Sequence, residues 1–270
     1  MNLNKNKFHL LRPILAILIL FIPLYPKFPL STVKNTYVAI RLDDVLIAIS
    51  VFFYFLHQLK NSFPIFKNKI FKLFLIYFLA ISLSTLHALL ILKTTPANIL
   101  ILHFLRRLEY MSLAFIAISA IPRKKDLNWP IPFFLLASFF VTIYGYGQKF
   151  LAWPMISTMN EEFSKGYILQ LSQWSRINAS FAGHYDLAVF LSVFLVIFLA
   201  YIFQIKKKIT KIFLIIFWLL LFQLLIFTVS RVSLMAFWIG SIILLFFIKK
   251  KLWIIPISAL IIFNSFKSVA

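Results

Sequence analysis

The chain has 270 residues, of which 62% are hydrophobic and only 13% are charged. Soluble domains are about 45–50% apolar and about 25% charged, so this composition excludes an ordinary soluble fold and indicates lipid as the solvent. A net charge of +21 could suggest nucleic acid as a partner, but the cations cluster between apolar runs, as in the loops of membrane proteins, so nucleic acid is not expected. Without cysteine, the chain has no disulfide framework, zinc–thiolate site or thiol nucleophile.

Apolar runs long enough to cross a bilayer recur along the whole chain. A helix rising about 1.5 Å per residue needs about 20 residues to cross roughly 30 Å of hydrocarbon. The first run resembles a signal peptide without a cleavage site, so we interpret it as a retained helix. Pro23, Pro26 and Pro29 predict that its outer end is irregular. The sequence predicts an all-α, polytopic transmembrane helix bundle of about nine spans, at residues 10–30, 42–59, 70–92, 98–121, 131–150, 184–205, 210–229, 232–248 and 252–266.

The distribution of lysine and arginine predicts the orientation of these spans. Cytoplasmic loops of membrane proteins carry an excess of both residues. Most of the 28 cations lie in alternate loops, near residues 5–12, 60–72, 123–125, 206–211 and 249–251. We therefore expect a cytoplasmic N-terminus and an extracytoplasmic C-terminus. Residues 151–183 then form the longest extracytoplasmic loop. Since no internal repeat or low-complexity linker is found, we expect a single integral-membrane domain over residues 1–270.

Three charged residues interrupt the fourth predicted span, in the stretch "HFLRRLEYM" at residues 103–111. An Arg or Asp in the middle of a membrane costs about 2.5–3.5 kcal/mol on insertion scales, so such residues need an explanation. Arg106 and Glu109 have the i,i+3 spacing of an ion pair within one helix. Alternatively, a cation here faces a polar cavity in the bundle. Both interpretations remain open at this point.

Two arginines are predicted on the extracytoplasmic side. Arg176 lies in the longest loop, and Arg231 lies at the junction of the seventh and eighth spans, in "TVSRVSLMAF". Either one alone is explained by solvation or by snorkelling to lipid headgroups. Together they suggest a binding site, because a guanidinium keeps its charge and grips phosphate oxygens with a planar fork. A lipid-linked diphosphate presents its phosphates at this depth.

His184 and Asp186 lie at the entrance of the sixth span. A single histidine near an interface is more often a solvated or capping residue than a base, and Asp186 in a first helical turn would meet the positive end of the helix dipole. Because both are expected at the depth of the two arginines, we group Arg176, His184, Asp186 and Arg231 as candidate substrate-binding residues. The sequence assigns no catalytic residue, metal site or cofactor.

Two motifs carry a resemblance to a known family. "RINASFAGHYDLAVFL" at residues 176–191 is followed by "TVSRVSLMAF" at 228–237. Together they resemble the O-antigen ligase and O-antigen polymerase family of bacterial multipass membrane proteins. In that family an Arg precedes a "tF-G-p-aLA" helix entrance, and "t-SRg-llal" opens a later helix. The resemblance extends loosely from about residue 20 to 250 and is sharpest over residues 176–236. This chain has Val232 where the family has Gly, and His-Tyr-Asp where it commonly has Asn-Pro-Asn.

The resemblance implies a glycosyltransferase of the bacterial inner (cytoplasmic) membrane. Such enzymes move a glycan from a polyprenyl-diphosphate carrier to an acceptor hydroxyl at the outer face, without a nucleotide sugar or a tightly bound metal. The implied partners are the polyprenyl-diphosphate-linked glycan, a glycan or lipid acceptor, and membrane lipid. Fixed cations would stabilise the diphosphate leaving group, and a base would take the proton of the acceptor.

The family also has a large outer loop after these spans, and that loop carries the histidine thought to be the base. Since this chain ends at Ala270, we expect it to be an incomplete chain that lacks the C-terminal part, so activity of the 270 residues alone stays an open question. Two alternatives remain. One is a transporter or flippase for a lipid-linked glycan, although no inverted hydropathy repeat is evident. The other is a non-catalytic membrane fragment.

Overall fold

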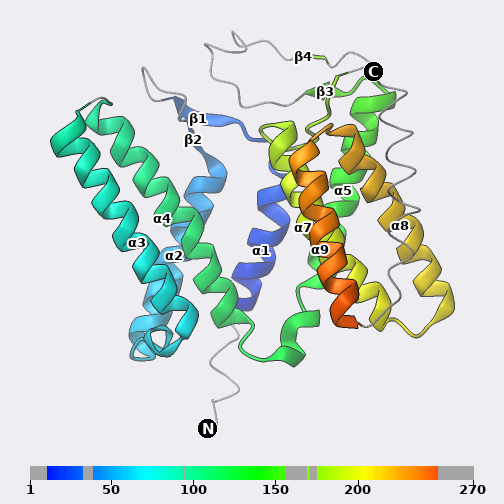
Figure 1. The fold of residues 1–270 in the computed structure, drawn as a ribbon, viewed down its shortest axis with the longest axis horizontal. Coiled ribbons are helices and arrows are strands. Elements are labelled where there is room, and N and C mark those ends of the chain that lie inside the picture. The colour runs from blue at the N-terminus through cyan, green and yellow to red at the C-terminus, as the bar shows by residue number, and fades with distance from the viewer. Residues whose placement is uncertain (1–10, 33–38, 94, 156–168, 171–174, 249–270) are drawn as a thin grey trace. The chain divides into compact units, whose positions relative to one another are not determined.

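A computed structural model describes residues 11–32, 39–93, 95–155, 169–170 and 175–248, most of them in helices (Figure 1). Six helical segments are long and apolar enough to cross a membrane, so the chain is a multipass helical membrane protein, as the composition predicted. They are Leu42–Lys60, Lys69–Leu92, Lys124–Phe150, His184–Gln204, Lys208–Phe227 and Arg231–Ile248. The ninth predicted span, 252–266, lies outside the described residues.

The chain divides into two compact units, and the boundary falls within one helix, between Ala137 and Ser138. The first unit contains two short strands as well as helices. Its elements are α1 (Leu11–Leu24), β1 (Pro29–Thr32), β2 (Ala39–Arg41), α2 (Leu42–Lys60), a 3-10 turn η2 (Pro64–Lys67), α3 (Lys69–His87), a π-helical turn η3 (Ala88–Leu92), α4 (Ala97–Ala120) and a 3-10 turn η4 (Lys124–Asn128).

Helix α1 ends earlier than the predicted span, as its prolines suggested. Pro23 lies in its last turn, and the chain then continues as strand β1, which pairs antiparallel with β2. Because β2 leads directly into α2, two acidic residues, Asp43 and Asp44, fall in the first turn of α2. A carboxylate at this position meets the positive end of the helix dipole. Asp44 also accepts a hydrogen bond from the backbone N–H of Arg41, at 2.9 Å, which fixes the start of the helix.

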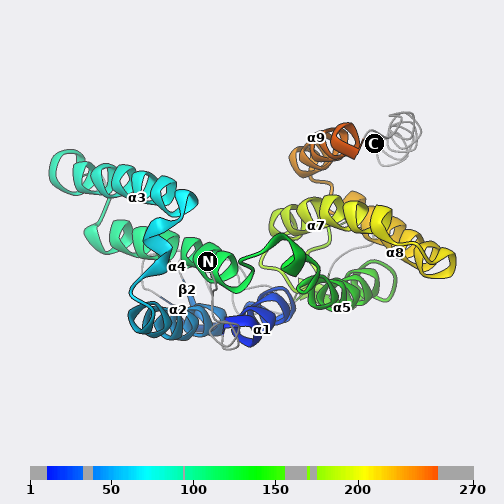
Figure 2. The same ribbon diagram turned by 90° about the horizontal axis from the view of Figure 1, so that it is seen from below.

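Helix α4 packs against α1, α2 and α3 in the first unit (Figures 1 and 2). The buried core lies between these helices and consists of aliphatic and aromatic side chains, including Leu11, Leu15, Leu18, Ile47, Tyr54, Phe115 and Ile116. Helix α3, by contrast, carries an exposed apolar stripe in which Leu73, Ile76, Leu79 and Leu83 are between 59% and 66% exposed. A stripe of this kind is unfavourable in water and is expected on a lipid-facing helix.

The second unit contains the end of α5 (Ile131–Phe150), β3 (Pro154–Met155), β4 (Leu169–Gln170), α7 (His184–Gln204), α8 (Lys208–Phe227) and α9 (Arg231–Ile248). Helix α7 is central and packs against both α8 and α9 (Figure 2). Leu187, Leu191, Leu195 and Phe198 are almost completely buried along one stripe of α7, at the three- and four-residue spacing of a helix. The ends of α5 and α8 and the starts of α7 and α9 lie at the same end of this unit (Figure 1).

Candidate functional site

The structure brings two of the predicted site residues into contact at the start of α7. One terminal nitrogen of Arg176, Nη1, lies 3.2 Å from Nε2 of His184. A guanidinium can only donate hydrogen bonds, so Nε2 must be the acceptor and the imidazole is in its neutral form. The ring of His184 also lies against that of Tyr185, at an interplanar angle of 39° and with 4.0 Å between the ring centroids. Arg176 itself is exposed.

The turn between α8 and α9 lies beside the Arg176 loop. The backbone N–H of Ile177 donates to the carbonyl of Phe227, at 3.4 Å. The turn then passes through Val229, which has a left-handed φ of 54°, and α9 begins at Arg231. The two arginine motifs are therefore joined by a backbone hydrogen bond at one end of the second unit, and both arginines are exposed. We refer to Arg176, His184 and Arg231 as the arginine end.

Asp186 is exposed in the first turn of α7. None of the ion pairs among the described residues involves it. Its position matches the interaction with the helix dipole that the sequence suggested. A role for Asp186 in substrate binding therefore stays a prediction.

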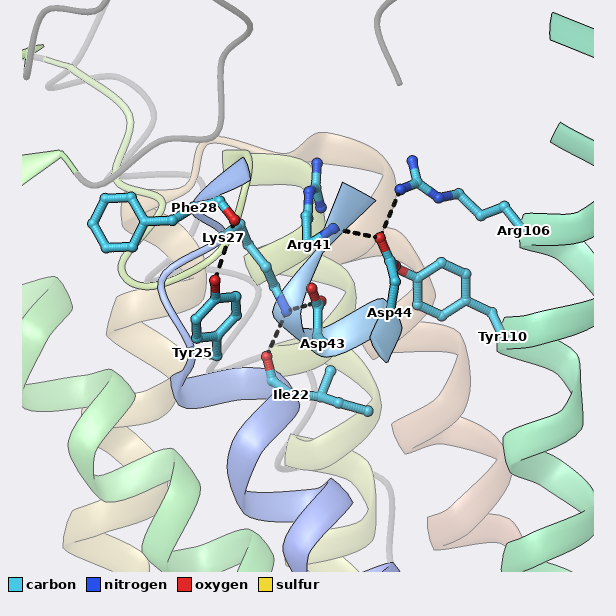
Figure 3. Close-up of polar contacts among 9 residues, drawn as sticks. All are labelled: Ile22, Tyr25, Lys27, Phe28, Arg41, Asp43, Asp44, Arg106 and Tyr110. Atoms are coloured by element: carbon cyan, nitrogen blue, oxygen red, sulfur yellow. Dashed lines mark hydrogen bonds and ion pairs between the residues drawn. The ribbon is translucent and has the colours of Figure 1, made fainter. Parts of the chain in front are cut away.

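A second polar group lies in the first unit, and of its members Arg106 was singled out from the sequence but the two aspartates and Lys27 were not. Nζ of Lys27 lies 2.6 Å from Oδ2 of Asp43 and also donates to the carbonyl of Ile22, at 2.8 Å (Figure 3). This ion pair is buried, since the side chains of Lys27 and Asp43 are 7% and 1% exposed. Burial lowers the pKa of Lys27, and the hydrogen bond and charge of Asp43 counteract that shift.

Asp44 receives hydrogen bonds from two side chains of α4 (Figure 3). Arg106 donates to its Oδ2 and Tyr110 to its Oδ1, each at 3.1 Å. Arg106 is thus paired with another helix, which the local i,i+3 spacing could not reveal. We refer to Lys27, Asp43, Asp44, Arg106 and Tyr110 as the aspartate cluster. The sequence signal for this cluster was the adjacent pair Asp43 and Asp44, which precedes an apolar run in a chain with only seven acidic residues.

An open cavity of about 270 Å³ lies between α2 and α4, next to this cluster. Its walls are mainly apolar, but Asp44, Arg106 and Glu109 also line it. Arg106 therefore lines a cavity, as the second interpretation expected, but the cavity is mainly apolar rather than polar. One carboxylate oxygen of Glu109 is shielded from solvent and has no hydrogen-bond partner within the described part of the chain.

Within the described residues, no group of three or more histidine, aspartate or glutamate side chains could hold a metal ion. No family model, curated protein or solved structure matches the chain. Its function must therefore be argued from its motifs and from the geometry of the arginine end and the aspartate cluster.

Proposed function

We propose that the protein is a glycosyltransferase similar to the O-antigen ligases and polymerases, acting on a polyprenyl-diphosphate-linked glycan at the outer face of the bacterial inner membrane. The observation that carries this proposal is the arginine end. Two exposed guanidiniums, Arg176 and Arg231, come from separate sequence motifs whose backbones are joined by the hydrogen bond from Ile177 to Phe227. Their charge and planar donor forks suit a diphosphate.

The reaction requires charge stabilisation at the leaving group. The acceptor hydroxyl attacks the anomeric carbon of the glycan, the bond from that carbon to the carrier phosphate breaks, and the diphosphate leaves on the polyprenyl chain. Negative charge grows on the diphosphate as the bond breaks, so fixed cations lower the barrier. Arg176 and Arg231 would hold the diphosphate. The neutral His184 would orient Arg176 by accepting its hydrogen bond, at 3.2 Å.

The proton of the acceptor hydroxyl must go to a general base. His184 is a weak candidate for this role, because its Nε2 already accepts a hydrogen bond from Arg176. In the family that the chain resembles, the base is instead thought to be a histidine on a large outer loop. The base is therefore left unassigned within these residues, and binding of the carrier is the activity that the described residues support.

A second candidate function, transport of a lipid-linked glycan, is favoured by the cavity between α2 and α4. Asp44, Arg106 and Glu109 offer polar groups inside an otherwise apolar wall. Polar residues within a membrane protein often mark a substrate path. The two functions differ in their product, because a transporter leaves the glycosidic bond intact whereas a transferase breaks it.

Binding of the carrier to the purified chain in lipid nanodiscs tests the proposed function. We expect a polyprenyl diphosphate to bind more tightly than the matching polyprenyl monophosphate, since the diphosphate carries more negative charge and offers each guanidinium fork a phosphate group of its own. Excess phosphatidylglycerol should not displace it. Equal affinity for the diphosphate, the monophosphate and phosphatidylglycerol would show general attraction to anionic lipid and would contradict the proposal.

The proposal also requires the arginine end to face away from the cytoplasm, with nine spans and a cytoplasmic N-terminus. The chain has no cysteine, so single cysteines can report its orientation. In intact cells, an impermeant thiol reagent should label Ser175→Cys, beside Arg176, and should leave Lys207→Cys, in the turn between α7 and α8, unlabelled. The reverse pattern would place the arginine end in the cytoplasm and exclude the proposed reaction at the outer face.

A further inference from the structure

The side chain of Gln148, in the last turn of α5, forms hydrogen bonds with the loop that connects Arg176 to the start of α7. Its Oε1 accepts from the backbone N–H of Ala179, at 2.8 Å. Its Nε2 lies 3.2 Å from Oδ1 of Asn178 and 3.3 Å from the carbonyl oxygens of Ala179 and Pro154. The side chain is only 2% exposed. Gln148 thus joins the end of α5, the turn after it and the loop that leads into α7.

The backbone that Gln148 holds is strained. Ala179 has a φ of 48°, in the left-handed region that residues other than glycine rarely adopt. Such a conformation is unfavourable for alanine and persists only when its surroundings impose it. Here the same amide group binds both the N–H and the C=O of Ala179. Asn178 extends the network, because its Nδ2 donates to the carbonyl of Phe181, at 2.8 Å.

The fixed turn lies between the two members of the arginine–histidine pair. Arg176 is two residues before Asn178, and His184 is three residues after Phe181. Residues 177–181 are buried whereas Arg176 is exposed, so the exposed cation extends from a buried, hydrogen-bonded turn. A binding group on a preorganised loop loses less conformational freedom when its ligand arrives, which increases affinity without any new contact.

We propose that Gln148 is a positioning residue for the diphosphate site: it imposes the strained turn at Ala179 and so aims Arg176 at the carrier. The role of the aimed guanidinium rests on the proposed function. The control of the loop by Gln148 does not. Gln148 lies beneath the loop and is buried, so it acts on the ligand through Arg176 rather than by direct contact.

The test compares Gln148→Met with Gln58→Met in the full chain. Gln58, in α2, is also 2% exposed, and its Oε1 accepts from a turn, at Ile65 N–H, so its loss is a matched control for removing a buried amide. Hydrogen exchange of residues 177–181 should become faster in Gln148→Met only. Affinity for the polyprenyl diphosphate should fall about tenfold, the scale of losing one or two net hydrogen bonds.

Two further variants distinguish positioning from a general packing role. Adding Ala179→Gly to Gln148→Met should restore part of the affinity, because glycine adopts a φ near 48° without strain. In an Arg176→Lys background, Gln148→Met should weaken binding of the diphosphate little further, since the guanidinium that Gln148 positions is already absent. If Gln148→Met does not fold, Gln148→Asn replaces it. Asparagine keeps a neutral amide but is one methylene shorter, so it cannot reach both the N–H and the C=O of Ala179, and it should show the same faster exchange.

The inference and the proposed function can fail separately. If the unmodified chain shows no preference for the diphosphate, the proposed function is wrong, and hydrogen exchange still decides whether Gln148 controls the loop. If the chain prefers the diphosphate and Arg176→Lys weakens binding, but Gln148→Met and Gln58→Met have equal effects on exchange and affinity, the inference about Gln148 is overturned.

Discussion

Replacing Lys27 with methionine is expected to destabilise the protein by about 3–5 kcal/mol, the usual cost of removing one partner from a buried ion pair. Methionine fills a similar volume, so the loss would come from the charge. Asp43 is 1% exposed and would be left as a buried carboxylate without its cation. Its Oδ1 has no hydrogen-bond partner among the described residues even in the intact protein, so no spare partner is at hand. Thermal or denaturant unfolding in detergent measures the change.

The double variant Lys27→Met, Asp43→Leu is the control for this prediction. Replacing both members of a buried ion pair with apolar groups is often neutral or stabilising, so the double variant should be much more stable than Lys27→Met alone. Arg123→Gln provides a second comparison. It breaks an exposed pair, with Arg123 52% exposed, and should change stability far less. If the effects of Lys27→Met and of Asp43→Leu, each measured alone, simply add in the double variant, the buried ion pair is not what stabilises this part of the fold.

Replacing either arginine of the arginine end with lysine is expected to weaken binding of the polyprenyl diphosphate by about 1–3 kcal/mol, or roughly 5- to 150-fold, the scale of a hydrogen bond to a charged group. Lysine keeps the positive charge and loses the planar fork. Arg176→Lys would also lose the geometry that holds the guanidinium 3.2 Å from His184. Titration of the carrier into nanodiscs containing each variant measures the change.

Lys206→Ala is the matched control, because Lys206 is an exposed cation of the same unit, in the turn between α7 and α8. It should leave binding unchanged. In the double variant, the effects of Arg176→Lys and Arg231→Lys should not add, since groups that bind one ligand together are energetically coupled. If Lys206→Ala weakens binding as much as the arginine variants do, the carrier is attracted by the net charge of the protein and not by a specific site.

The helices were predictable because lipid imposes a length on every apolar run. The predicted spans 131–150 and 184–205 correspond to α5, at Ile131–Phe150, and α7, at His184–Gln204. The early end of α1 followed from Pro23, since proline lacks the N–H that continues a helix. Arg176 and Arg231 were grouped as candidate binding residues because both were predicted on the extracytoplasmic side, and the structure joins the backbones of their two motifs through Ile177 and Phe227.

The polar pairs were not predictable in the same way. Lys27 and Asp43 are 16 residues apart in the sequence, and Asp44 and Arg106 are 62 apart, so only the packing of α2 against α4 and the turn after α1 bring them together. Spacing within one helix offered only the local alternative, Arg106 with Glu109. Gln148 and Ala179 are 31 residues apart and belong to a helix and a loop, so no periodic pattern connects them.

The most direct test of the proposed site is to map where the carrier binds. A polyprenyl diphosphate with a photoactivatable group next to its phosphates can be crosslinked to the intact chain in nanodiscs, and the labelled peptides identified by mass spectrometry. We predict labelling within residues 175–186 and 228–235, suppressed by unlabelled polyprenyl diphosphate and unaffected by excess phosphatidylglycerol. Labelling confined to the walls of the cavity between α2 and α4, or labelling that the unlabelled carrier does not suppress, would contradict the assignment of the arginine end as the diphosphate site.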